Sequence, residues 1–542
     1  QNQSSIDKTW YHGKPPSDAG NKCAMPGGSA GQFECDGCTV DSVVNSYAGP
    51  WCYCKTPATG HNNTQYCIPP MEVPEQLNLQ VADATSVVAS FVTRGKTYEK
   101  EREACSAMFG QTEESMQLVP GISHHYKHLS KGEGMSYTLH FIKLAGLEPG
   151  KNYVYKVKSH ASEWSPVYTF RGIDLTLPKF AIYGDMGHTK HGPMGNLEEE
   201  CTSGKIDFIV HMGDHAYDLG GANDKRGDAY MNVFSRVLAS CPWIPIIGNH
   251  EVNDGDHYQR YLNMTWGQTL VETKSTAVSA LGDFLTKATL FGPGFHAAVP
   301  SKTSRYFSVD LGAIHIVGLD LNRLDDGQLS WLEEDLKKVN RETTPWILVS
   351  SHFPLFHPSV AENMGASNDF YSGDGHEKYA TSGHDFVPVE CDALGKCKET
   401  VGEALLRNQQ ALLPVLEKFG VDIYDAGHVH DYAATWPICR IGSVSGICKD
   451  EHSKPIKNYK NPKGTVHIVE GNGGVPGVLG VNDLKPCAPK EPDWCRVHGH
   501  GGNHGIISIL SPEILKYEHV ENPTGKVTDV MTIIQNRHGP FI

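Results

Sequence analysis

The chain has 542 residues, which is enough for roughly two to four domains. Its 47 Lys and Arg against 62 Asp and Glu give a formal net charge of −15, and this acidity argues against a nucleic-acid-binding role. A hydrophobic content of 39% excludes a disordered chain, and no stretch approaches the ~20 apolar residues of a membrane span. The composition therefore predicts a soluble globular protein.

Residues 1–70 are predicted to form a small disulfide-rich segment. Six of the fifteen cysteines fall here: Cys23, Cys35, Cys38, Cys52, Cys54 and Cys67. This density is typical of proteins from oxidising compartments, and a chain that starts at Gln1 suggests a removed signal peptide, so we expect secretion. The Cys35-x-x-Cys38 spacing leaves a zinc module as an alternative.

The later cysteines predict further disulfides, because most of them fall into close pairs. These are Cys201 with Cys241, Cys391 with Cys397, Cys439 with Cys448, and Cys487 with Cys495. Cys105 is left over, either as a buried thiol or as a bridge between the chains of a homodimer. Three sequons, at Asn2, Asn62 and Asn263, permit the glycosylation expected of a secreted glycoprotein.

Residues 71–172 are predicted to form a separate all-β sandwich. Segments 84–93 and 152–158 are rich in β-branched and aromatic residues, and turn signals such as Pro149-Gly150 bound them. About 100 residues of such strands suit a two-sheet sandwich domain.

Residues 173–542 change to an α/β pattern. Short apolar runs predict buried strands at 180–183, 208–212, 243–247, 314–319 and 346–349, with a further one at 421–426. Helical patterns follow at 328–339 and 408–418. Strands alternating with helices predict a layered α/β domain, in which residues 363–402 read as an irregular insertion.

Polar residues follow five of these predicted strands directly. They are Asp185, then Asp214 and Tyr217, then Asn249 and His250, then His352, and finally His428 and His430. Each alone has an ordinary interpretation, such as a turn, a helix cap or, for Tyr217, a packed aromatic ring. Together they indicate a ligand site, because the carboxyl ends of the strands in an open α/β sheet border the crevice where ligands bind.

The residue types indicate two metal ions. Seven ligating side chains with one shared carboxylate suit a pair of metals of mixed hardness, and Asp214 is the central candidate for the shared ligand. Two metals about 3.5–4 Å apart are the usual clamp for phosphoryl chemistry. A tyrosine has a pKa near 10, so only a strongly Lewis-acidic ion would hold Tyr217 as phenolate at acidic pH, which favours Fe(III).

The order of these motifs resembles the purple acid phosphatases, which belong to the calcineurin-like metallophosphoesterases. The carrying motifs are Gly184-Asp-x-Gly187, Gly213-Asp-x-x-Tyr-Asp218, Gly248-Asn-His-Glu251, the strand-end His352 and Gly427-His-x-His430. The resemblance covers roughly residues 73–520. It implies a fibronectin type III-like domain at 71–172, before a metallophosphoesterase domain at 173–542.

The resemblance also implies roles for individual residues. Fe(III) would be held by Asp185, Asp214, Tyr217 and His430, and a divalent Fe, Zn or Mn by Asp214, Asn249, His352 and His428. His250 would orient phosphate or protonate the leaving oxygen, with Glu251 supporting the ligands. His357 is a further candidate catalytic residue, at a place where relatives carry histidines that contact substrate.

These features predict a secreted acid phosphatase that hydrolyses small phosphomonoesters by attack of a metal-activated hydroxide on phosphorus. One alternative keeps the metals but acts on phosphodiesters or nucleotide anhydrides. Another alternative is a non-catalytic extracellular structural glycoprotein, which the Cys-rich segment, the insertion and Asp431-Tyr-Ala-Ala434 after the last motif suggest, since plant relatives carry Ala-Tyr-Glu-Arg there.

Overall fold

The computed structural model describes most of the chain beyond residue 73. The described residues are 74–94, 105–127, 136–160, 162–187, 194–217, 219, 225–253, 305–358, 401–441, 444–448, 459–474, 484–487, 492–522 and 524–541. The predicted Cys-rich segment, the Cys391–Cys397 pair, the three sequons and nearly all of the predicted insertion lie outside them. No helix within the described ranges is long and apolar enough to cross a membrane.

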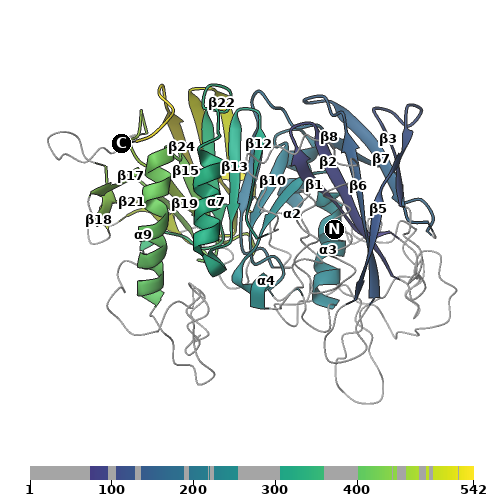
Figure 1. Ribbon diagram of the computed structural model, residues 1–542, viewed down its shortest axis with the longest axis horizontal. Helices are drawn as coiled ribbons and strands as arrows, with labels where there is room; N and C mark the ends of the chain where they lie inside the picture. Colours follow the sequence, from purple (N-terminus) through teal and green to yellow (C-terminus); the bar gives the residue numbers. More distant parts are fainter. Residues whose placement is uncertain are drawn as a thin grey trace, which may run out of the picture.

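Two large β-sheets pack face to face (Figure 1). The first has ten strands in the order β24 (Lys526–Ile534), β23 (Ile514–Glu521), β22 (Asn503–Ser511), β9 (Lys179–Tyr183), β10 (Phe208–Met212), β11 (Trp243–Ile246), β1 (Glu75–Asp83), β2 (Ser86–Arg94), β6 (Ser136–Ala145) and β5 (Ile122–Lys127). The second has eight, in the order β12 (Phe307–Leu311), β13 (Ile314–Leu319), β14 (Trp346–Ser351), β15 (Ile423–Ala426), β19 (Val466–Glu470), β16 (Tyr432–Thr435), β21 (Cys495–Gly499) and β20 (Lys485–Pro486).

Parallel pairing dominates the centre of both sheets. Strands β9, β10 and β11 are parallel in the first sheet, and β13, β14, β15 and β19 are parallel in the second. Their inward side chains, such as Val210 and Leu348, fill one apolar core between the sheets. Parallel strands buried on both faces read as continuous apolar runs, which is why the sequence predicted them well.

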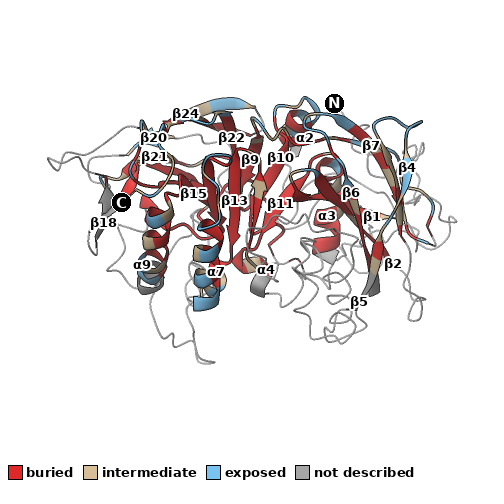
Figure 2. Cartoon of the chain, turned by 45° about the horizontal axis from the view of Figure 1, so that its top comes forward, coloured by how far each residue is buried: buried red, intermediate tan, exposed pale blue. Residues whose placement is uncertain are grey.

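Helices cover the outer faces of both sheets. Helices α2 (Met194–Thr202) and α3 (Lys225–Leu238) pack on the first sheet, and α7 (Asp326–Leu336) and α9 (Val401–Phe419) pack on the second. Figure 2 shows the buried strands in red, with pale-blue exposed residues on α7 and α9. Short helices lie at Asn249–Asn253 (α4) and Leu321–Arg323 (η2). The layered α/β sandwich architecture predicted from the sequence is confirmed, and it contains two packed sheets.

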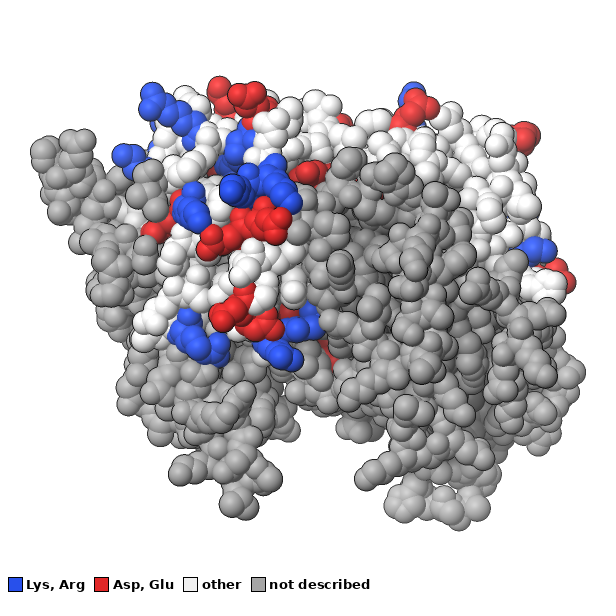
Figure 3. Space-filling model, viewed as in Figure 1, with Lys and Arg blue, Asp and Glu red and all other residues white. Residues whose placement is uncertain are grey.

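The surface over α7 and α9 carries charges of both signs. Acidic and basic side chains are interspersed on this face in Figure 3, without a large area of one sign among the described residues. Lys418 of α9 lies 2.6 Å from Glu333 of α7, so an exposed ion pair links the two helices. Such a pair contributes about 0–1 kcal/mol, and the apolar contacts beneath carry the packing.

A buried histidine connects the second sheet to α7. The ring of His315 in β13 lies with Nδ1 2.6 Å from Asp310 Oδ1 and with Nε2 3.0 Å from Asp335 Oδ2. Ser308 donates to the other oxygen of Asp335 at 2.8 Å. Burial lowers the pKa of His315, but the two carboxylates outweigh it and raise this pKa to about 9. A charged imidazole therefore lies between two carboxylates in this layer.

The N-terminal described region is a β-sandwich, as its strand pattern predicted. A four-stranded sheet, β4 (Gln117–Pro120), β3 (Ser106–Gly110), β7 (Asn152–Lys158) and β8 (Tyr168–Arg171), packs against β1, β2, β6 and β5 around a separate apolar core. The unexpected feature is that β1 also pairs in parallel with β11, at Gln80 and Trp243. The sandwich and the α/β layers thus share one continuous sheet.

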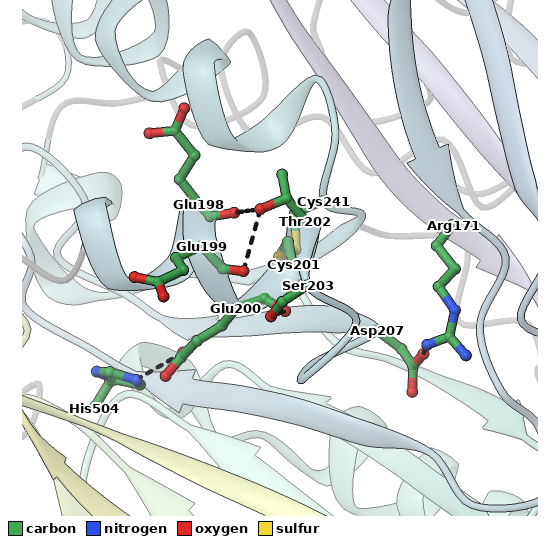
Figure 4. The surroundings of a disulfide bond; sticks show 10 residues. All are labelled: Arg171, Glu198, Glu199, Glu200, Cys201, Thr202, Ser203, Asp207, Cys241 and His504. Carbon is green, nitrogen blue, oxygen red and sulfur yellow. Dashed lines mark hydrogen bonds and ion pairs between the residues drawn. A yellow bond between two sulfur atoms is a disulfide. The ribbon is translucent and has the colours of Figure 1, made fainter. Parts of the chain in front are cut away.

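Side chains reinforce this junction. Gln76 of β1 donates from Nε2 to Asp228 of α3 at 2.8 Å, and Trp243 donates from Nε1 to Asn78 at 3.2 Å. Arg171 at the end of β8 donates to Asp207, just before β10, at 3.0 Å (Figure 4). The two regions are therefore held by backbone pairing and by buried polar contacts together.

Three of the predicted disulfides are present. They join Cys201 to Cys241, Cys439 to Cys448 and Cys487 to Cys495, and the second of them staples the hairpin of β17 (Ile438–Ile441) and β18 (Val444–Ile447). Figure 4 shows how the first ties the end of α2 to the segment before β11. Cys105 is a buried thiol that donates to the carbonyl oxygen of Ile122, so it is not available to bridge two chains.

Candidate metal centre

The predicted site residues lie where the carboxyl ends of the two sheets meet. Strands β9, β10 and β11 of the first sheet lead to Asp185, Asp214 and Asn249, while β14 and β15 of the second lead to His352 and His428. The sequence predicted that five strand ends deliver these side chains to one crevice. The structure divides the five strand ends between two sheets, and the site lies at their shared edge.

The first of two donor groups, meaning sets of side chains with atoms that could bind a metal, consists of Asp185, Tyr217 and His430. The Tyr217 hydroxyl lies 3.1 Å from Asp185 Oδ1 and 2.7 Å from His430 Nε2. His430 Nε2 is itself 3.4 Å from Asp185 Oδ1. Burial raises the pKa of Tyr217, and the negative charges of Asp185 and Asp214 raise it further, so only a strongly Lewis-acidic cation would convert this phenol to phenolate.

A second group joins Asp214, Asn249, His352 and His428. Asn249 Oδ1 is 2.9 Å from His352 Nε2 and 3.1 Å from His428 Nδ1, and these two ring nitrogens are 3.1 Å apart. Asp214 Oδ1 lies 3.3 Å from His352 Nε2. The ligand atoms of Asp214, His352 and His428 all lie within 4.8 Å of one another, close enough to hold one metal ion.

The orientation of His352 turns one ring nitrogen toward the other candidate ligands. Its Nδ1 lies 2.7 Å from the Met212 carbonyl oxygen, which can only accept, so Nδ1 carries a proton and Nε2 is the nitrogen that could bind a metal. Nε2 faces the amide oxygen of Asn249 at 2.9 Å. Burial lowers the pKa of His352, but Asp214 and Asp185 outweigh it and raise the pKa to about 9. A metal ion shared by Nε2 and the Asn249 oxygen would therefore replace a proton held between them.

Backbone strain is concentrated in the same residues. Asp185, Asp214, Tyr217 and His428 have φ values of 58°, 51°, 51° and 68°, and they are four of the six described non-glycine residues with positive φ. Such conformations cost about 1–3 kcal/mol each and persist where the surroundings enforce them, commonly at functional sites. The strand-end turns are therefore shaped to aim these side chains, at a cost in stability.

The two donor groups are adjacent. The backbone N–H of His428, from the second group, donates to Asp185 Oδ2 of the first at 2.6 Å. Asp214 faces the second group directly, and its charge also acts on Tyr217 of the first. The position of Asp214 thus suits the predicted shared ligand.

His250 lies on the open side of the site. Its ring is 4.7 Å from the Tyr217 ring, and its Nε2 is 3.8 Å from Asp214 Oδ2. The side chains of His250 and His430 are 30% and 28% exposed, whereas those of Asp214 and His352 are buried. A ligand from solvent would therefore meet the imidazoles of His250 and His430 first.

Glu251 joins two of the ligand-bearing turns. Its carboxylate is fully buried and accepts from the backbone N–H of Asp214 at 2.8 Å, of His215 at 2.9 Å and of Gly248 at 2.8 Å. Burial raises the pKa of Glu251 to about 7, and the nearby charge of Asp214 adds to the effect. The supporting role that the sequence suggested for Glu251 thus has a definite geometry.

The structure places His357 away from the open side. His357 is only 2% exposed, and its Nε2 lies 2.8 Å from Asp431 Oδ1. Both this pairing and the orientation of His352 by the Met212 carbonyl escaped sequence reasoning. A backbone acceptor leaves no residue-type signal, and His357 and Asp431 are 74 positions apart in the chain.

Comparison with known families identifies the class of protein. The family described as calcineurin-like phosphoesterase matches residues 178–432, and the N-terminal domain of the purple acid phosphatases matches residues 74–172. The chain thus carries a match to the N-terminal domain of the purple acid phosphatases, followed by a match to a calcineurin-like phosphoesterase domain. The resemblance and the enzyme class predicted from the sequence are confirmed.

Individual relatives agree with this assignment. Acid phosphatase type 7 of Mus musculus is 26% identical over 416 residues, covering 73% of this chain and 77% of the relative. Purple acid phosphatase 21 of Arabidopsis thaliana is 25% identical over 394 residues, covering 69% of each. A purple acid phosphatase structure from yellow lupin seeds covers 86% of this chain and 75% of its own, with 19% identity and a TM-score of 0.56. That likeness confirms the fold.

Proposed function

We propose that this chain is a secreted, binuclear-metal acid phosphatase that hydrolyses small phosphomonoesters. The observation that carries the proposal is the convergence of two adjacent donor groups, three donors around Tyr217 and four around His352, at one edge of the two sheets. Two adjacent metals are the arrangement that phosphoryl transfer uses.

In this proposal, Fe(III) is held by Asp185, Asp214, Tyr217 and His430, and a divalent Fe, Zn or Mn ion by Asp214, Asn249, His352 and His428. The hard carboxylate and phenol oxygens of the first set suit Fe(III), and the imidazole and amide donors of the second suit a divalent ion. When bound, the two ions supply Lewis acidity toward the phosphate and activate a water molecule. Met212 fixes the His352 tautomer through its carbonyl oxygen.

His250 performs the proton chemistry in this scheme. Its imidazole is partly exposed on the open side and lies beside Asp214 and Tyr217, where a bound phosphate would sit. From there it can donate a hydrogen bond to a phosphate oxygen or a proton to the leaving oxygen. No covalent link between chain and phosphate is required.

The test begins with the metal content of the purified protein, by elemental mass spectrometry. We expect two metals per chain, including iron, and hydrolysis of a model phosphomonoester. Asp214→Ala should lose more than about a hundredfold of activity, or ~2.7 kcal/mol of transition-state stabilisation. Asp207→Asn serves as the matched control. Asp207 is a buried carboxylate just before β10, the strand that leads to Asp214, but it contacts Arg171 and lies outside the site.

Near wild-type activity in a folded Asp214→Ala protein would refute the proposal. Faster hydrolysis of a model diester than of the monoester would replace the monoesterase by a diesterase at the same centre. The disulfides motivate the secreted location, because such bonds persist in oxidising compartments. Recovery of the expressed protein only from the reducing cytosol, with these cysteines as thiols, would contradict that part.

A further inference from the structure

Two segments that carry proposed metal ligands meet outside the two donor groups. The 352–357 loop follows β14 and begins with His352. The 427–431 loop follows β15 and carries His428 and His430. His357 at the end of the first contacts Asp431 at the end of the second, with 2.8 Å between Nε2 and Oδ1. Both side chains are 1% exposed.

The 427–431 loop is tightly folded. The N–H of Val429 donates to the carbonyl of Gly427 at 2.8 Å, and the N–H of Asp431 donates to the carbonyl of Val429 at 2.7 Å. These are two successive γ-turns, in which residue i+2 donates to the carbonyl of residue i. The first has His428 at its centre with a φ of 68°, so the loop is strained. Contacts with neighbouring segments must hold such a loop in place.

The backbone supplies several of those contacts. The N–H of Gly427 donates to the His352 carbonyl at 3.0 Å, and Gly471 donates to the Asp431 carbonyl at 3.1 Å. Two side chains of the loop reach the 352–357 loop: His428, whose ring lies against His352 and Phe353, and Asp431 at the other end. Asp431 Oδ1 contacts His357, while Asp431 Oδ2 is buried and has no hydrogen-bond partner within the described structure. The Asp431 carboxylate therefore depends on His357.

The 352–357 loop is itself fixed to the outer layers. Gln409 of α9 donates to the Leu355 carbonyl at 2.6 Å, and the Tyr424 hydroxyl of β15 donates to the Phe353 carbonyl at 2.9 Å. His357 thus projects from an anchored segment. Because Asp431 directly follows His430, any movement of Asp431 changes where His430 meets Tyr217.

We propose that His357 is a positioning residue, which holds Asp431 and through it keeps His430 against Asp185 and Tyr217. The inference rests on the proposed function, since His430 is there a ligand of the Fe(III) site. It assigns His357 a different role from the substrate contact that the sequence suggested. The reason is burial: the His357 side chain is 1% exposed, whereas that of His250 on the open side is 30% exposed.

The experiment is a double-variant cycle between His357 and Asp431. His357→Ala, Asp431→Ala and the double variant are compared with wild type for iron per chain, for the tyrosinate-to-iron absorption band, and for kcat and KM on a model phosphomonoester. His357→Gln and Asp431→Asn are the conservative variants, since each can keep a hydrogen bond across the contact. Should His357→Ala not fold, His357→Leu takes its place.

The matched control is His467→Phe. His467 is another buried histidine of the same layer, and its ring packs on Phe356 and Tyr424. Both of its ring nitrogens lack a hydrogen-bond partner in the described part of the chain. Replacing it therefore removes a buried imidazole beside the same loop without touching the proposed contact.

We expect each alanine variant to bind iron about 10–100-fold more weakly, with a shifted or weakened absorption band. The kcat should fall while KM stays within about twofold. The double variant should lose no more than the worse single variant, because both remove one contact. The conservative variants should recover most of the iron, and His467→Phe should match wild type.

Two results would overturn the inference. One is a His357→Ala protein that keeps its iron and its absorption band but raises KM, which would show contact with substrate. The other is a pair of losses that simply add in the double variant. Wild-type protein that binds no metal would instead refute the proposed function, and this inference with it. If wild-type protein binds two metals, and the His357 and Asp431 variants keep as much iron as the His467→Phe control, this inference alone would be refuted.

Discussion

Glu251 offers the sharpest test of how the site is held together. Its buried carboxylate accepts three backbone N–H groups, from Asp214, His215 and Gly248, at 2.8–2.9 Å. In Glu251→Gln, an NH₂ group replaces one carboxylate oxygen. One or two of the backbone N–H groups then face this NH₂ group, which cannot accept their hydrogen bonds. Each lost bond to a charged acceptor costs about 1.5–3 kcal/mol.

Part of that cost should appear as weaker metal binding. Asp214 has a φ of 51°, and the bond to Glu251 helps to hold this conformation. Replacing a residue that orients ligands typically costs 10–100-fold in metal affinity, or ~1.4–2.7 kcal/mol. We expect this loss in Glu251→Gln when metal-depleted protein is titrated with Zn(II) or Mn(II), with phosphatase activity falling in parallel.

Glu200→Gln is the control for this experiment. Glu200 is also a buried carboxylate, and it contacts His504 at 3.0 Å (Figure 4). Its other oxygen accepts from Lys205 at 2.6 Å, so neither contact involves a proposed ligand. It should lower the free energy of unfolding without changing the metal affinity. If Glu251→Gln is folded and binds metal as tightly as wild type, the proposed role of Glu251 in shaping the turn at Asp214 is wrong.

Two predictions concern stability. The pKa of His315 is about 9 in the folded protein, against an ordinary value of 6.5. Its ion pairs therefore stabilise the fold fully below about pH 6.5, and this stabilisation is lost as pH rises through 9. Chemical unfolding should show a free energy of unfolding about 3 kcal/mol lower at pH 9.5 than at pH 6, and His315→Gln should lack this difference. The disulfide of Cys201 closes a loop of 40 residues, so Cys201→Ser with its partner also changed should cost up to about 4 kcal/mol, and an unchanged melting temperature would contradict this.

Sequence patterns predicted the parts of the fold whose burial is uniform. The run 208–212 corresponds to β10 and the run 314–319 to β13, because strands covered on both faces are apolar throughout. Strand β23 was missed, since its buried and partly exposed positions largely alternate and no continuous apolar run marks it. The domain boundary proposed at residue 172 stays a prediction. Strand β1, before this boundary, pairs with β11, after it, so the sheet itself marks no division there.

The site was predictable to the extent that its residues follow strand ends. Asp214 and His352 come directly after apolar runs, and the turn chemistry around them is visible in the sequence. The pairing of His357 with Asp431 was not, because it depends on how two loops from distant parts of the chain fold toward each other. A residue type suggests a chemistry, while burial decides whether the side chain can reach a substrate.

The pairing of β1 with β11 has a consequence for how these two regions can be separated. Without β1, strand β11 would become a sheet edge with unsatisfied backbone groups, only three residues before Asn249. Exposed edges invite pairing with other chains, and proteins usually cover them. The N-terminal sandwich is thus the covering of that edge. A catalytic fragment expressed alone would need a replacement there, such as a charged or proline-bearing strand, to avoid pairing with other chains through this edge.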